Sequence, residues 1–137
     1  MTWVVDSSVA VKWIAPEEGQ DAAIKLIGSE RELIAPEFLL VETGNTVWKK
    51  VRRGELSGEQ SAQGLGFIRR VVQRFIPDEL LADRALAIAM ETEHPIYDCL
   101  YLACAEREDG TVATADAKWA NKLSARFGAR LYLLGVS

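Results

Sequence analysis

Short β-branched runs alternate with helical patterns along almost the whole chain, and this alternation limits the possible folds more than any other feature. The expected strands are residues 2–5 (TWVV), 32–35 (ELIA), 74–76 (RFI), 111–114 (TVAT) and 129–134 (ARLYLL). The expected helices are residues 7–14, 17–29, 36–53, 57–74, 78 to about 91, a helix that contains Asp98, and 116–128. Strand–helix alternation of this kind predicts an α/β fold with a central parallel sheet and helices on both faces.

Two of the expected helices lie next to each other at about residues 36–74 and predict a helical hairpin arm. Pro36 suits the first turn of the first helix, and Gly54 ends it. The second helix contains Gly64 and Gly66 in the stretch GLGF. This stretch does not follow a strand, so it is not a phosphate-binding loop, and a helix weakened by glycine is the better interpretation.

The length of 137 residues predicts a single domain over residues 1–137 with a sizeable core. No apolar stretch is long enough to span a bilayer, and the first residues lack the basic start of a secretory signal, so we expect a cytoplasmic protein with no membrane partner. Two cysteines five residues apart are too few for a zinc site and suit a core in a reducing compartment. The single histidine, His94, precedes Pro95 and suits a turn.

The net charge of −4 is unevenly distributed. Residues 45–75 contain only two acidic side chains against seven basic ones, namely Lys49, Lys50, Arg52, Arg53, Arg69, Arg70 and Arg74. The rest of the chain contains nine basic and eighteen acidic side chains. A basic arm beside an acidic body favours contact with a phosphate backbone, although a solvated helical face explains the charge equally well.

Carboxylates follow two of the expected strands. Asp6 comes directly after strand 2–5, and Asp116 lies two residues after strand 111–114. In a parallel sheet both side chains emerge at the carboxyl edge, where such folds bind ligands. Each residue also suits a helix N-cap, which is an ordinary structural role.

Two further acids lie in helices. Glu42 shares a helical face with Phe38 and Asn45, which predicts that this face packs. Asp98 opens a nearly unbroken apolar run, so we expect it to be buried rather than to cap the helix at the surface. Carboxylates that converge in one cleft repel each other, and a divalent cation relieves this repulsion. Hard oxygen ligands favour Mg²⁺ or Mn²⁺ over zinc.

Four segments with these acids occur in an order that resembles a known family. The segments VVDSSVAVKWIAPEE, APEFLLVETGNTVWKK, HPIYDCLYLACAERE and VATADAKW together resemble the PIN domain, and specifically VapC-type toxin ribonucleases. The resemblance implies that the catalytic and metal-binding residues are Asp6, Glu42, Asp98 and Asp116. It also implies that Ser8, Asn45 and Thr114 support these acids. The pair Thr43–Gly44 departs from the small aliphatic residues that are usual there.

The resemblance implies a three-layer α/β/α fold and an endoribonuclease that depends on Mg²⁺ or Mn²⁺. It also implies a cognate VapB-type antitoxin and a homodimer. The basic arm would then hold RNA phosphates through Lys49, Lys50, Arg52, Arg53, Arg69 and Arg70, with Lys12 close to the acids. Trp13 and Trp48 could stack on bases, although core packing is the more usual role of aromatic residues at helical spacing.

Three other functions remain open at this stage. An aspartate-dependent phosphatase would place a nucleophile after the first strand, but it needs a second Asp where this chain has Ser8. A receiver-like module needs adjacent acids after the first strand, and these are missing. A non-catalytic PIN-like domain that binds RNA or a protein would not need the intact set of four acids.

Overall fold

Five parallel strands form the centre of the molecule. The computed structural model describes residues 1–135, and in it the strands lie in the order β3-β2-β1-β4-β5. Their bounds are β1 Thr2–Val5, β2 Glu32–Pro36, β3 Arg74–Ile76, β4 Thr111–Thr114 and β5 Leu131–Leu133. Every neighbouring pair in the sheet is parallel, as the strand–helix alternation predicts.

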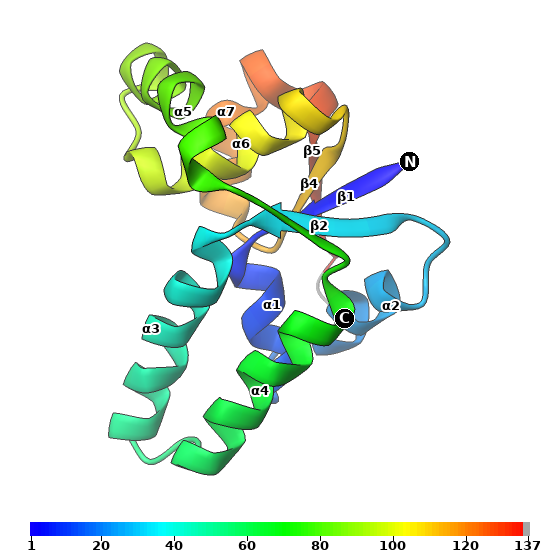
Figure 1. Cartoon of the computed structure of the whole chain (residues 1–137), viewed down its shortest axis with the longest axis vertical. Helices are drawn as coiled ribbons and strands as arrows, with labels where there is room; N and C mark the ends of the chain where they lie inside the picture. Colours follow the sequence, from blue (N-terminus) through cyan, green and yellow to red (C-terminus); the bar gives the residue numbers. More distant parts are fainter. Residues whose placement is uncertain (136–137) are drawn as a thin grey trace.

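Helices cover both faces of this sheet and complete three layers (Figure 1). Their bounds are α1 Ser7–Ile14, α2 Gln20–Ile27, α3 Phe38–Arg52, α4 Gly58–Val71, α5 Asp78–Thr92, α6 Ile96–Glu108 and α7 Ala117–Phe127. Helices α5, α6 and α7 lie on one side, and α1 to α4 lie on the other (Figure 1). The predicted three-layer α/β/α fold is therefore confirmed. Within residues 1–135, no helix is both long and apolar enough to cross a membrane.

The expected elements are present with bounds that differ by up to three residues, and two of these differences have a clear physical reason. Pro36 was expected in the first turn of a helix, but it is the last residue of β2 and pairs with Ile76. Proline suits this position because its missing N–H falls where the ladder ends, and the next amide, that of Glu37, donates to Ile76 O. The last strand is shorter than expected, since a 3₁₀ turn at Gly128–Arg130 precedes it.

The predicted helical arm is formed by α3 and α4, which pack against each other (Figure 1). A capping box of Ser57 and Gln60 begins α4. A Cβ atom added at Gly64 would lie only 2.6 Å from Ile14 Cγ2. Glycine at this position therefore lets α4 approach α1 closely, and GLGF is part of a packed helix rather than merely a weak one.

Helix α6 passes through the core, and residues 99–105 are all buried. Cys99 and Cys104 are both buried free thiols, which confirms their expected role as core residues. Burial raises the pKa of Cys99 to about 11 and that of Cys104 to about 12. These thiols therefore stay protonated and unreactive near neutral pH.

Candidate acidic site at the carboxyl edge of the sheet

Asp6 and Asp116 lie at the same edge of the sheet, as expected. Strands β1 and β4 are parallel neighbours, with Val5 beside Ala113, so the residues after them emerge together. Each aspartate also caps the helix that follows it. Asp6 Oδ1 accepts from the Val9 amide at 3.2 Å, and Asp116 Oδ1 accepts from the Trp119 amide at 3.1 Å. Both residues thus lie at the carboxyl edge of the sheet and cap a helix at the same time.

Two hydroxyl groups connect the edges of β1 and β4. Ser8 Oγ donates to Asp6 Oδ1 at 2.6 Å and accepts from the Ala115 amide at 2.8 Å. Thr114 Oγ1 lies 3.3 Å from Ser8 Oγ and accepts from the Asp116 amide at 3.1 Å. Ser8 and Thr114, which the resemblance marks as supporting residues, therefore contact the acids or their backbone directly.

Glu42 enters the same region from α3. Its Oε1 accepts a 2.7 Å hydrogen bond from the hydroxyl of Tyr101 on α6. Tyr101 was not among the expected site residues, and it is buried within the apolar run. A tyrosine buried in such a run needs a hydrogen-bond partner for its hydroxyl. This requirement could have marked Tyr101 as a candidate site residue from the sequence.

Asp98 is less buried than expected. Its side chain is 40% exposed, and Oδ2 lies 2.7 Å from His94 Nε2. The apolar run predicts burial of α6, but Asp98 lies in the first turn, before the helix enters the core at Cys99. His94 also does more than form a turn, since the i, i+4 spacing brings its ring to the carboxylate.

The charges of three acids act on one another. Burial raises the pKa of Asp6 to about 7, hydrogen bonds from Ser8 and Thr114 oppose this shift, and the charge of Glu42 adds to it. Burial also raises the pKa of Glu42; hydrogen bonds from Tyr101 and Ser7 oppose this, while the charge of Asp98 adds to it. Asp6, Glu42 and Asp98 therefore form one electrostatic cluster.

Asp116 lies beside this cluster rather than within it. It is exposed, and it lines a hollow of ≈ 320 Å³ together with His94, Pro95, Lys118, Trp119 and Lys122. Its connection to Asp6 runs through Thr114 and Ser8. The structure thus brings three of the four predicted acids together and places the fourth in the neighbouring hollow.

The donor set suits a hydrated divalent cation better than a tightly chelated one. Among residues 1–135, no three acidic, histidine or cysteine side chains are close enough to hold one ion as they are placed. Three mutually repelling carboxylates nevertheless favour a cation, and Mg²⁺ keeps several of its waters. Asp6, Glu42 and Asp98 could therefore hold such an ion partly through water.

Asn45 lies outside the cluster, which corrects the expected packing face of α3. The buried residues of this helix are Leu39, Thr43 and Val47, whereas Asn45 is exposed. The packing face is therefore centred on Thr43 rather than on Glu42. The amide of Asn45 forms no side-chain hydrogen bond with the described residues, and we leave it out of the site.

The predicted RNA-binding side chains fall into two groups. Lys12 and Lys50 are both paired with Glu17 and are largely covered, so they are poorly placed to bind phosphate. Arg53 pairs with Glu55, and Arg74 on β3 bridges Glu32 on β2 and Glu108 at the end of α6. The exposed basic groups that remain on the arm are Lys49, Arg52, Arg69 and Arg70.

The two tryptophans of this region differ as well. Trp13 donates from Nε1 to Ala23 O at 2.8 Å and packs against the core, so it is not available to stack on a base. Trp48 is 52% exposed on α3, with the guanidinium of Arg52 5.1 Å from its ring centre.

Comparison with known proteins agrees with the fold. The PIN domain model matches residues 3–122, and Ribonuclease VapC3 of Pyrobaculum aerophilum is 30% identical over 128 residues. That alignment covers 91% of this chain and 97% of the relative. The chain therefore belongs to the PIN domain family. Within this family, its relatives are VapC-type ribonuclease toxins.

Solved structures show the same fold at lower identity. PAE2754 from Pyrobaculum aerophilum superposes with a TM-score of 0.70 at 23% identity, covering 89% of this chain and 79% of that chain. VapC20 of Mycobacterium tuberculosis, described as a toxin that cleaves the sarcin-ricin loop, gives 0.68 at 18% identity, covering 88% and 94%. VapBC2 of Rickettsia felis, bound to a DNA fragment from its promoter, gives 0.64 at 15% identity, covering 89% and 92%.

Proposed function

We propose that the protein is an endoribonuclease that depends on Mg²⁺ or Mn²⁺ and is the toxin of a VapBC-type pair. The observation that supports this most is the electrostatic cluster of Asp6, Glu42 and Asp98 at the carboxyl edge of the sheet. Membership of the PIN domain family and the 30% identity with Ribonuclease VapC3 also support this proposal. The missing second Asp at position 8 and the tie between Ser8 and Asp6 disfavour the phosphatase alternative.

In this proposal each acid has a distinct task. A divalent cation at this site would offset charge on the scissile phosphate and lower the pKa of water. Asp6 and Glu42 are held by Ser8 and Tyr101, so their carboxylates stay oriented without the ion. Asp98, whose side chain is 40% exposed, would face the entering strand. Asp116 supports the outer side of the site from the neighbouring hollow.

The test is cleavage of single-stranded RNA by the full chain. We expect cleavage with Mg²⁺ or Mn²⁺, loss of cleavage in EDTA, and products with a 5′-phosphate and a 3′-hydroxyl. Asp98→Asn should abolish cleavage with little change in melting temperature. Asp83→Asn is the matched control, because Asp83 is exposed on α5 and forms no ion pair within the described residues. Full activity of Asp98→Asn, or of the wild type in EDTA, contradicts the proposal.

We also infer a VapB-type antitoxin as partner, as in the Rickettsia felis VapBC2 complex. Such a partner must cover the acidic edge or the arm to block the enzyme. The product of a short neighbouring gene should therefore suppress RNA cleavage when it is co-purified with the protein. Undiminished cleavage by a stable complex of the two would contradict this role.

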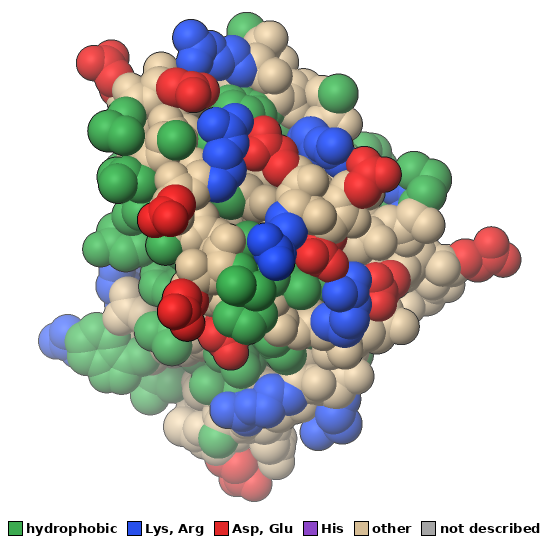
Figure 2. Space-filling model, turned by 45° about the horizontal axis from the view of Figure 1, so that its top comes forward, with side chains coloured by type: hydrophobic (Ala, Val, Ile, Leu, Met, Phe, Trp, Pro, Cys, Tyr) green, Lys and Arg blue, Asp and Glu red, His purple; other side chains and the backbone are tan. Residues whose placement is uncertain are grey.

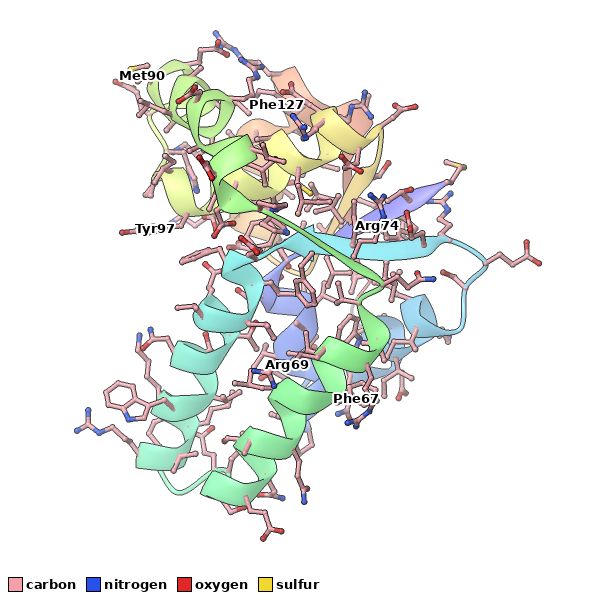
Figure 3. All side chains as sticks on the ribbon, viewed as in Figure 1. Phe67, Arg69, Arg74, Met90, Tyr97 and Phe127 are labelled. Atoms are coloured by element: carbon pink, nitrogen blue, oxygen red, sulfur yellow. The ribbon has the colours of Figure 1, made fainter. Side chains whose placement is uncertain are left out.

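A homodimer is the remaining partner that we propose. The exposed apolar side chains include Leu86 and Met90 on α5, Tyr97 on α6 and Val41 on α3. Met90 and Tyr97 project from the same side in Figure 3, and apolar side chains gather along that edge in Figure 2. Tyr97 also stacks on Phe38 with ring centres 5.4 Å apart, which joins α6 to α3. Methionine and aromatic side chains are typical of interfaces.

The dimer is tested by light scattering after size exclusion. Tyr97→Glu should convert a dimer into a monomer by placing a charge in the apolar row. Ile24→Glu on α2 is the control, because Ile24 is similarly exposed but belongs to the other layer of helices. A monomeric wild type would contradict this part of the proposal.

A further inference from the structure

His94 lies between Asp98 and Lys122 and hydrogen-bonds to both. Its Nε2 is 2.7 Å from Asp98 Oδ2, and its Nδ1 is 3.2 Å from Lys122 Nζ. It is the only histidine in the chain. These contacts connect the start of α6 to α7 through one imidazole ring.

The position of the ring is fixed by its surroundings. Glu93 ends α5 in the left-handed region with φ 54°, and the amide of His94 then donates to Ala89 O. Lys122 Nζ also donates to Glu93 O at 3.1 Å, so it holds both the backbone and the ring of this turn. The side chain of His94 is only 14% exposed.

The partners of the ring determine where its proton resides. A lysine ammonium has three donors and no acceptor, so Nδ1 must accept from Lys122. A neutral ring then carries its proton on Nε2 and donates it to Asp98 Oδ2. The other oxygen, Oδ1, accepts no hydrogen bond from residues 1–135, so it is left for another ligand.

We propose that His94 is a positioning residue for Asp98 and that Lys122 sets its tautomer. This inference rests on the proposed function, in which Asp98 helps to hold a divalent cation. Donors behind a ligand orient it, and their loss typically lowers metal affinity by about 10–100-fold. His94, which is bonded to Asp98, and Lys122 line the same hollow as Asp116, the fourth predicted acid.

The tautomer is read directly by nuclear magnetic resonance of ¹⁵N-histidine in metal-free protein, because a single ring gives the signal. We expect the Nε2–H form in the wild type and a larger Nδ1–H fraction in Lys122→Met. Lys118→Met is the control, since Lys118 lines the same hollow but forms no hydrogen bond with His94. A wild-type Nδ1–H ring, or a ring unchanged by Lys122→Met, overturns the proposal.

The positioning role is tested by Mn²⁺ titration followed by electron paramagnetic resonance. His94→Leu should bind Mn²⁺ about 10–100-fold more weakly. His94→Gln keeps an N–H near the position of Nε2 and should bind almost as the wild type does. Melting curves confirm that both variants are folded. Equal Mn²⁺ affinity of His94→Leu and the wild type, or equal loss in both variants, overturns the proposal.

The two proposals fail in different ways. A wild type that binds Mn²⁺ and shows the expected tautomer but cleaves no RNA contradicts the ribonuclease and leaves His94 as a positioning residue. A wild type that cleaves RNA, with His94→Leu equal to it in Mn²⁺ affinity and in kcat, contradicts the role of His94 and leaves the ribonuclease.

Discussion

The hydroxyl of Tyr101 donates a 2.7 Å hydrogen bond to Glu42 and thereby joins α6 to α3 beneath the acidic site. This bond lowers the pKa of Glu42, against the effect of burial. In Tyr101→Phe the pKa of Glu42 should rise, so the acidic limb of the pH–rate profile should move to higher pH. Loss of a hydrogen bond to a charged group should also cost about 1.5–3 kcal/mol of stability.

The control for this variant is Tyr97→Phe on the same helix. Tyr97 is exposed and stacks on Phe38, but its hydroxyl forms no hydrogen bond within residues 1–135. It should change neither the pH profile nor the urea midpoint. Identical profiles for Tyr101→Phe and the wild type would show that the bond does not tune Glu42.

The buried carboxylate of Asp6 should make the metal-free protein less stable as the pH rises. The pKa of Asp6 is raised from 3.8 to about 7, so between these values the folded state holds a proton that the unfolded state has lost. Stability from this group is therefore full below about pH 4, falls through the window to pH 7, and stays low above it. In EDTA at pH 8, Asp6→Asn should be more stable by a few kcal/mol, since one pKa unit is worth about 1.4 kcal/mol.

Thermal melts of Asp6→Asn and the wild type across pH 4–8 check this expectation. The difference between them should vanish near pH 4. Asp116→Asn is the matched control, because Asp116 also caps a helix after a strand but is exposed. Asparagine caps helices as well as aspartate does, so neither variant should lose its helix start. A pH-independent difference for Asp6→Asn would refute the buried charge as its cause.

The two glycines of GLGF should respond in opposite ways to alanine. In Gly64→Ala the new Cβ would collide with Ile14, so the arm must shift, and we expect a loss of about 1–3 kcal/mol. In Gly66→Ala the new Cβ only meets Arg70 Nη1 at 3.6 Å, an ordinary contact. Helix propensity then favours alanine by about 0.5–1 kcal/mol. Urea denaturation of both variants measures this, and equal effects would disprove close packing at Gly64.

Thr43 buries a hydroxyl that has no hydrogen-bond partner among the described residues. An unsatisfied buried hydroxyl is costly, so Thr43→Val should stabilise the fold by about 1 kcal/mol. Thr46→Val is the control, because Thr46 Oγ1 donates to Glu42 O at 3.3 Å and loses this bond. Differential scanning calorimetry should give a higher melting temperature only for Thr43→Val. A lower one would mean that the hydroxyl has a favourable contact.

Arg69 and Arg70 should hold RNA through its phosphates without reading its sequence. The double variant Arg69→Gln/Arg70→Gln should bind unrelated single-stranded RNAs equally less well. Its log–log salt dependence should be shallower by about 1.4, because each phosphate contact to a single strand contributes about 0.7. Binding is measured by fluorescence anisotropy in Ca²⁺. The exposed pair Arg107→Gln/Arg126→Gln, outside the arm, is the control, and an equal loss there would argue against the arm as the RNA surface.

The fold was predictable from the sequence because its signals are local. Strands such as residues 2–5 and 111–114 are short β-branched runs, and Asp6 follows the first of them directly, so the site edge could be placed as well. Pro36 was misplaced because proline suits both a first helical turn and a strand end, and only the pairing with Ile76 decides between them.

The site residues that were not predicted from the sequence form contacts with residues far away along the chain. Tyr101 meets Glu42 across 59 positions, and Lys122 meets His94 across 28. Asn45 was misplaced because helical spacing shows which residues share a face of α3 but not whether that face points to the core. The buried face includes Thr43, one residue after Glu42, and leaves Asn45 exposed. The bond between His94 and Asp98, by contrast, joins residues four positions apart, so helical spacing could have predicted it.

The absence of a side chain at Gly64 has a mechanical consequence. Helix α1 begins next to Asp6 and ends at Ile14, where α4 touches it. Eight residues of helix span about 12 Å, so one short helix connects the region of Asp6 to the middle of α4. If RNA binds to the arm as proposed, the length of α1 would fix the distance between the phosphates held by the arm and the phosphodiester bond that is cleaved.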